Sequence, residues 1–152
     1  MLLIRGATSL DLFSLLQLGE EFYNESSSAS KFGLDIEFLS KNLQHAIDDE
    51  NFCVLVAIKD SEIVGALVGV VAREMWAKES CGYINMIFVQ RKHRNLVTGL
   101  KLVAQFEKWC SHSAAYQIGT HSGIGGNFPA DALFRAAGYH LLGKNMIKFK
   151  EE

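Results

Sequence analysis

The chain has 152 residues, of which 49% are hydrophobic and 21% charged, a length and composition typical of one folded domain. Its net charge of −2 argues against a general DNA- or RNA-binding protein, which carries a strong basic excess. Three cysteines, an odd number, do not make a disulfide framework, and no apolar run is long enough for a signal peptide or a membrane span, so we expect a cytoplasmic protein.

The first half of the chain predicts a strand, two helices and a hairpin of two strands, over residues 2–5, 12–24, 36–47, 52–58 and 63–72. Thr8 and Asp11 have the spacing of a capping box in front of the first helix. The serine-rich residues 25–30 predict the loop that follows this helix, and Lys59-Asp60-Ser61 predicts the turn of the hairpin.

The second half predicts a strand, a helix, a strand, a helix and a terminal hairpin, over residues 82–89, 98–110, 116–120, 131–137, 139–142 and 145–149. Gly138 stands where a glycine commonly follows the end of a helix. The order β-α-α-β-β-β-α-β-α-β-β is mixed rather than strictly alternating. We therefore expect a single α/β domain over residues 1–152, with a mixed sheet instead of a regular doubly wound one.

Several catalytic and metal-binding patterns fail. Residues 123–128 begin like a dinucleotide loop but end in Phe128 where the last glycine is needed. Residues 119–123 are one position out of register for a nucleophile elbow. Cys110 and His112 lack a companion pair of ligands, so we expect no metal site.

A stronger signal lies between the strand at 82–89 and the helix at 98–110. The connection carries the basic residues Arg91, Lys92, His93 and Arg94, and the helix opens with Thr98 and Gly99. Main-chain N–H groups at a helix N-terminus attract phosphate, and the helix dipole adds to the attraction. The alternative interpretation is a solvated basic turn without a ligand.

With this connection, the order of elements resembles the GNAT superfamily of N-acetyltransferases. The superfamily loop reads Arg/Gln-x-x-Gly-x-Gly/Ala, and residues 94–99 match its first and last positions, with Val97 replacing the middle glycine. Residues 127–139 match the later block Asn-x-x-Ala-x-x-Leu-Tyr-x-x-x-Gly-Phe in spacing, with Phe134 in place of the tyrosine, and Ile4–Thr8 resembles the superfamily's opening. The resemblance implies a fold whose fourth and fifth strands splay apart.

The resemblance also implies the activity: transfer of an acetyl group from acetyl-CoA, as co-substrate, to a primary amine by direct attack. A homodimer is compatible with it. The residues implied to contact acetyl-CoA are Ile87, Phe88, Val89, Arg94, Asn95, Leu96, Val97, Thr98, Gly99, Leu100, Asn127 and Phe134. The strand residues among them would act through their main chain. Because valine disfavours positive φ, the loop at Val97 is expected to stay in ordinary backbone conformations.

The catalytic groups are less clearly indicated. Strand alternation predicts Tyr83, Asn85 and Ile87 on one face, and the resemblance aligns Tyr83 and Asn85 with the places where relatives carry a basic carboxylate. Neither of these two side chains is a strong base, so we expect another residue to take the proton from the acceptor amine.

His121 is the best replacement base, because the pKa of histidine lies near working pH, and Glu79 comes second. Both also fit ordinary roles, as a loop histidine and a solvated turn carboxylate. Phe134 cannot protonate the departing thiolate, and Tyr139 is the candidate that would replace it, unless its ring only packs.

Two other functions remain open at this stage. A catalytically diverged relative would bind CoA or another protein without turnover. A nucleic-acid-associated enzyme would place the basic residues of 91–101 on a phosphate backbone, but the acidic balance of the chain argues against it. No motif identifies the acceptor.

Overall fold

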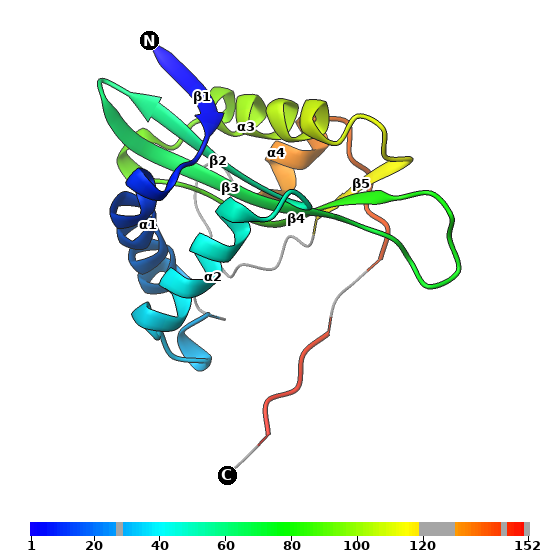
Figure 1. The fold of residues 1–152 in the computed structure, drawn as a ribbon, viewed down its shortest axis with the longest axis horizontal. Coiled ribbons are helices and arrows are strands. Elements are labelled where there is room, and N and C mark those ends of the chain that lie inside the picture. The colour runs from blue at the N-terminus through cyan, green and yellow to red at the C-terminus, as the bar shows by residue number, and fades with distance from the viewer. Residues whose placement is uncertain (27–28, 119–129, 144–145, 151–152) are drawn as a thin grey trace.

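The computed structural model describes residues 1–26, 29–118, 130–143 and 146–150 (Figure 1). The helices are α1 (Leu12–Glu25), α2 (Ile36–Asp48), α3 (Leu96–Trp109) and α4 (Ala130–Ala136). The strands are β1 (Leu2–Gly6), β2 (Phe52–Lys59), β3 (Glu62–Ala72), β4 (Cys81–Val89) and β5 (Ala115–Ile118). Every element predicted up to the fourth helix therefore occurs, in the predicted order. Within the described ranges, no helix has the length and apolar character needed to cross a bilayer.

The strands form one sheet in the order β1-β2-β3-β4-β5. Neighbours are antiparallel from β1 to β4, whereas β4 and β5 are parallel. The β2–β3 hairpin turns through Asp60 and Ser61, whose φ angles of 52° and 66° are those of a type I′ turn. The mixed sheet expected from the element order is confirmed.

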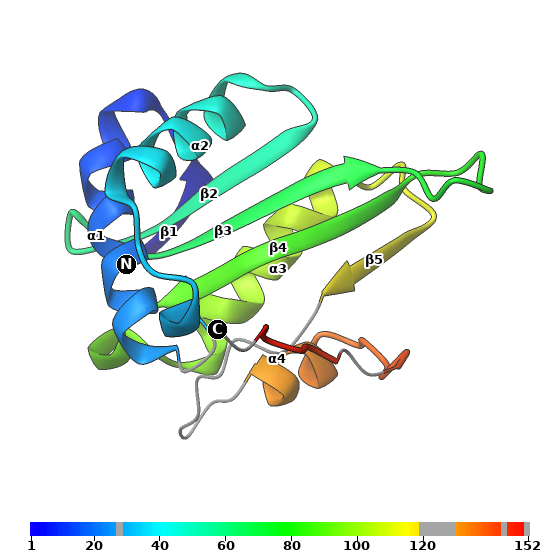
Figure 2. The same ribbon diagram turned by 90° about the horizontal axis from the view of Figure 1, so that it is seen from below.

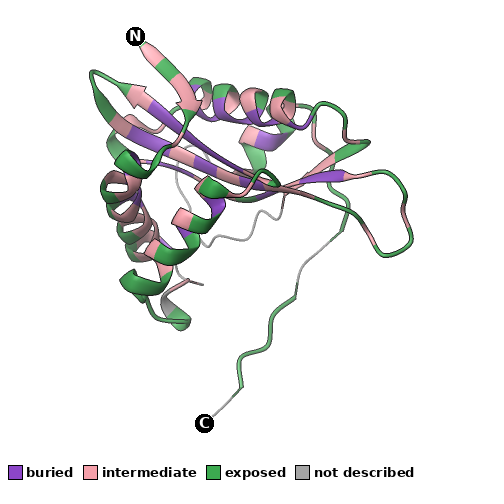
Figure 3. Ribbon diagram, in the orientation of Figure 1, coloured by how far each residue is buried: buried purple, intermediate pink, exposed green. Residues whose placement is uncertain are grey.

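Helices cover both faces of the sheet (Figure 2). On one face, α1 and α2 bury a core cluster that includes Leu15, Leu43 and Val56. On the other face, α3 and α4 bury a larger cluster around Phe106 and Phe134. Buried positions accordingly follow the strands and the inward sides of the helices (Figure 3).

The start of α1 follows the predicted capping box. The Thr8 side chain accepts a hydrogen bond from the Leu10 N–H at 3.3 Å, and the Asp11 carboxylate accepts one from the Thr8 N–H at 2.8 Å. The Arg5 guanidinium also donates to Asp11 at 2.7 Å, and this hydrogen bond lowers the pKa of the Asp11 carboxyl. The box therefore fixes the start of the helical segment after β1, and the Arg5 contact ties that start to the strand.

The end of α4 was also predictable. Gly138 adopts φ +91°, and the N–H of Tyr139 donates to the Phe134 carbonyl at 2.9 Å, as in a helix that closes on a left-handed glycine.

The prediction of a terminal hairpin is wrong, because residues 139–143 and 146–150 contain no strand. Large apolar side chains of this segment stay exposed, among them Leu142 and Met146. In the described part of the chain, β5 pairs with β4 only, and the segment after α4 does not add a strand to the sheet next to β5. Apolar alternation makes a strand only where a neighbouring strand accepts its hydrogen bonds.

Candidate active site

The connection between β4 and α3 leads from a buried strand into a helix N-terminus. After one 3-10 turn, η3 (Arg91–His93), Asn95 caps α3 by accepting a hydrogen bond from the Thr98 N–H at 2.9 Å. Helix geometry leaves the N–H groups of Leu96 and Val97 without a partner inside the helix, and the helix dipole favours an anion there. These two groups are the main-chain donors of the predicted loop, since the third is already used by the cap.

The two motif positions Val97 and Gly99 serve different purposes. Val97 is 56% exposed in the first turn of α3, and positive φ among the described non-glycine residues occurs only at Asp60 and Ser61. The expectation of an ordinary backbone at Val97 is therefore confirmed. Gly99 is buried, and a Cβ there would lie 2.9 Å from both methyl groups of Leu133. Its lack of a side chain lets α4 approach α3.

A β-bulge interrupts β4 in front of this connection. Val68 of β3 pairs with Met86, whereas the next residue, Gly69, pairs with Ile84. Asn85 is thus the extra residue of β4, without a partner in β3, and it is exposed. Such an insertion bends a strand and reverses the facing of the residues beyond it.

The bulge corrects the expected facing of β4. Ile84, Ile87 and Val89 all pack into the cluster beneath α3. Simple alternation would place Ile84 opposite Ile87 and Val89. The prediction that Tyr83, Asn85 and Ile87 share one face is therefore wrong, because the inserted residue shifts the period by one.

Beyond the bulge, β4 leaves its neighbour. β5 pairs with Cys81–Ile84 only, and in the described part of the chain β4 continues from there to Val89 without a partner on that side. Gln90 donates its N–H to Val64 at 2.8 Å, which sets the alternation of the β3–β4 hydrogen bonds. The N–H and C=O of Phe88 consequently point to β3, whereas those of Ile87 and Val89 point to the open edge.

A cleft of about 980 Å³ lies between the sheet and the segment after α4. Three residues predicted for the site, Asn85, Phe134 and Tyr139, line it, and so do Glu107 and Tyr116. The Phe134 and Tyr139 rings meet edge to face with centroids 5.2 Å apart. The cleft therefore brings together three of the predicted residues, from β4, α4 and the segment that follows.

Three ionisable side chains that line the cleft have raised pKa values. Burial raises the pKa of the Tyr139 hydroxyl and also that of the Glu107 carboxyl. The Tyr83 hydroxyl donates a hydrogen bond to the Glu74 carboxylate, and this bond raises the pKa of Tyr83. A phenol with a raised pKa keeps its proton at neutral pH.

The sequence matches the model of the acetyltransferase (GNAT) family over residues 14–139. This span is most of the chain and includes the bulged strand, the α3 N-terminus and α4. The chain belongs to the GNAT acetyltransferase family. A search of curated proteins finds no match.

Solved structures share the fold of this GNAT domain. A "possible acetyltransferase" from Clostridium difficile 630 has TM-score 0.74 and 16% identity, covering 100% of this chain and 99% of its own. Glucosamine-6-phosphate N-acetyltransferase from Arabidopsis thaliana has TM-score 0.73 and 11% identity, covering 99% of each chain. An aminoglycoside acetyltransferase from an uncultured soil metagenomic sample, in complex with sisomicin, has TM-score 0.64 and 21% identity, covering 99% and 95%.

The remaining candidates fall in different places. His121 and Asn127 lie outside the described residues. Glu79 is exposed in the β3–β4 connection and does not line the cleft. Within the described ranges, no group of three or more histidine, cysteine, aspartate or glutamate side chains is placed to hold a metal ion.

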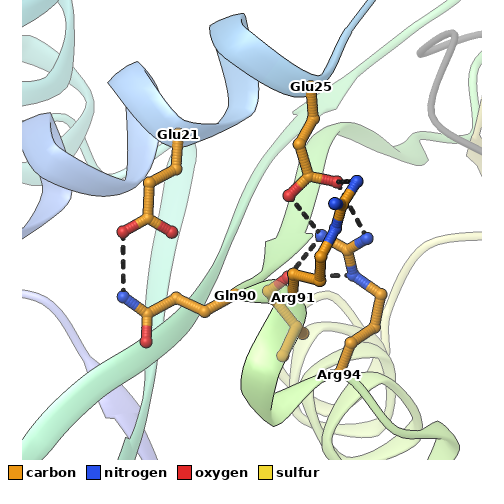
Figure 4. A network of polar contacts seen from close by, with 6 residues as sticks. Glu21, Glu25, Gln90, Arg91 and Arg94 are labelled. Atoms are coloured by element: carbon orange, nitrogen blue, oxygen red, sulfur yellow. Dashed lines mark hydrogen bonds and ion pairs between the residues drawn. The ribbon is translucent and has the colours of Figure 1, made fainter.

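The contacts that two carboxylates make with residues of the site were not predicted from the sequence. Glu74 bonds to Tyr83, and Glu25 forms an ion pair with Arg94 at 2.9 Å (Figure 4). An acidic residue at the end of α1 is a charge match for the basic β4–α3 connection, and this is the only signal that the sequence offers for Glu25.

The buried hydroxyl of Tyr139 leads to a prediction about stability. It has no hydrogen-bond partner in the described part of the chain. A buried donor without a partner is costly, so Tyr139→Phe is expected to raise the free energy of unfolding by about 1 kcal/mol in urea titrations. Tyr23→Phe, on α1, is the matched control and is expected to change it by less than about 0.5 kcal/mol. A clear loss of stability in Tyr139→Phe would mean that the hydroxyl is bonded after all.

Proposed function

We propose that the chain is an active N-acetyltransferase that moves an acetyl group from acetyl-CoA to a primary amine. The observation that carries the proposal is the edge of β4 beyond Asn85, where no described residue pairs with the outward main-chain groups of Ile87 and the strand leads into the N-terminus of α3. An extended thioester arm fits along such an edge, and a diphosphate fits the N–H groups of Leu96 and Val97, which have no partner inside the helix.

The residues of the open edge would act on the thioester through their main chain. The Ile87 N–H would donate to the thioester oxygen and stabilise the negative charge that develops on it during attack. Acetyl-CoA supplies an acyl group on a thiol leaving group. The amine nitrogen would form a bond to the carbonyl carbon while the carbon–sulfur bond breaks.

Two proton transfers complete the reaction. His121 is our proposed base, taking a proton from the attacking amine, since neither Asn85 nor exposed Glu79 is suited to the task. Tyr139 is our proposed acid, because its ring lines the cleft beside Phe134, and its hydroxyl would give its proton to the departing thiolate. Asn85 would orient the acceptor at the bulge.

The acceptor class is proposed from the solved relatives. One is an aminoglycoside acetyltransferase bound to sisomicin and another a glucosamine-6-phosphate N-acetyltransferase. Both names describe amines carried on a sugar. Amino sugars are therefore the first class to test on this chain, followed by peptides and small alkylamines.

Calorimetry with acetyl-CoA and an assay of thiol release test the proposal together. We expect binding with Kd between roughly 1 µM and 1 mM, and thiol release that depends on an added amine. Binding without release, across all acceptors, would support instead a diverged CoA-binding module. No binding at millimolar acetyl-CoA would overturn the transferase proposal.

A further inference from the structure

A polar network joins the end of α1 to the connection between β4 and α3 (Figure 4). Gln90 donates to Glu21 at 3.1 Å, and Arg94 donates to both oxygens of Glu25 at 2.9 and 3.0 Å. Arg91 lies 3.7 Å from the Glu25 carboxylate, but its side chain is 80% exposed. The only close ion pair of the three contacts is therefore that of Glu25 with Arg94.

The guanidinium of Arg94 donates hydrogen bonds to two different groups. Nε and Nη2 both donate to the Val89 carbonyl, at 3.0 and 2.8 Å, and Nη1 and Nη2 hold Glu25. These four hydrogen bonds leave one of the five N–H groups of an arginine. A phosphate is recognised by two parallel donors of the same fork, and no such pair remains.

The surroundings of Arg94 also fix it in place. Its guanidinium carbon lies 5.3 Å from the centroid of the Phe88 ring, and the Phe22 ring of α1 meets Phe88 edge to face at 5.9 Å. The Arg94 and Glu25 side chains are only 17% and 15% exposed. An anion approaching Arg94 would thus have to displace a largely buried carboxylate that also carries a negative charge.

We propose that Arg94 is a positioning residue for the acetyl-CoA loop, and that Glu25 is the partner through which it acts. The pair clamps the Val89 carbonyl, the last one on the open edge of β4, to the end of α1. It thereby sets the direction in which the chain leaves the strand and presents the Leu96 and Val97 N–H groups. This inference rests on the proposed function, because it concerns the binding of the same co-substrate.

The direction in which one substitution changes the affinity for acetyl-CoA distinguishes this role from that of a phosphate ligand. Glu25→Gln removes the ion pair, and the contacts of Glu25 in the network are with the side chains of Arg91 and Arg94. A positioning role predicts about tenfold weaker acetyl-CoA binding by calorimetry, because the loop loses its anchor. A ligand role predicts tighter binding, because the fork of Arg94 and its charge become available to the diphosphate.

The control keeps the charge change and moves it away from the network. Glu20→Gln, exposed on the same helix, removes one negative charge and is expected to leave the acetyl-CoA Kd unchanged within about twofold. S-acetylpantetheine, which lacks the diphosphate, is the second probe. Its weak binding should be unaffected by Glu25→Gln, whereas a general loss of structure would weaken both ligands.

Arg94→Lys keeps the proposal testable if Glu25→Gln folds poorly. Lysine preserves the charge but cannot form the paired hydrogen bonds to the Val89 carbonyl and to Glu25. A positioning role therefore predicts a loss of acetyl-CoA affinity comparable to that of Arg94→Gln. Retained affinity in Arg94→Lys, or tighter binding in Glu25→Gln, would overturn the inference while leaving the transferase proposal intact. A wild-type chain that binds no acetyl-CoA would overturn both.

Discussion

Replacing Phe106 with alanine is expected to lower the free energy of unfolding by about 3–5 kcal/mol, because it opens a cavity in the centre of the larger core cluster. The side chain is 0% exposed, and its ring lies 6.1 Å from that of Trp109 and 6.3 Å from that of Tyr116. A typical domain is stable by only about 5–15 kcal/mol, so the loss should be visible as a large shift of the urea midpoint. Phe13→Ala, where the side chain is 72% exposed, is the matched control and is expected to have little effect.

A second change tests the geometry behind this prediction. A Cβ on Gly69 would lie 2.4 Å from Cε2 of Phe106, so Gly69→Ala alone is expected to cost about 1–3 kcal/mol by overpacking. In the Phe106→Ala background the ring is gone, and the same substitution should cost much less. Additive losses in this double-mutant cycle would contradict the contact between Gly69 and Phe106.

Local signals explain why most of the fold was predictable. The capping box at Thr8 and Asp11 and the glycine at position 138 depend on residues within one turn of each other, and both occur as expected. The prediction of two strands in residues 139–149 failed because a strand depends on contacts that are distant in sequence. A strand is completed by hydrogen bonds to a partner elsewhere in the chain, and the sequence of the segment carries no information on whether β5 accepts it.

The same distinction holds for the candidate site. The basic connection and the helix N-terminus were visible because they are contiguous in sequence. The bulge at Asn85 was not, since a single inserted residue leaves the apolar run of β4 unchanged. The pairing of Arg94 with Glu25 spans 69 positions, and only the folded chain shows that the arginine of the motif is already occupied.

The bulge and the edge it opens give the prediction with the largest expected effect on activity. Ile87→Pro removes an N–H that points away from β3, so the β3–β4 hydrogen bonds stay intact and the chain should fold. If this N–H stabilises the developing oxyanion, the rate of thiol release should fall by about 100-fold to 1,000-fold. Ile87→Val keeps the N–H and should retain most of the activity.

Phe88→Pro provides the contrast one residue further on. The N–H it removes points to β3, and its loss should disrupt the sheet and the cooperative unfolding transition. The two proline variants therefore distinguish main-chain groups that hold the strand from those that meet the substrate. Full activity in a folded Ile87→Pro protein would rule out the Ile87 N–H as the oxyanion donor, and the catalytic role of the open edge with it.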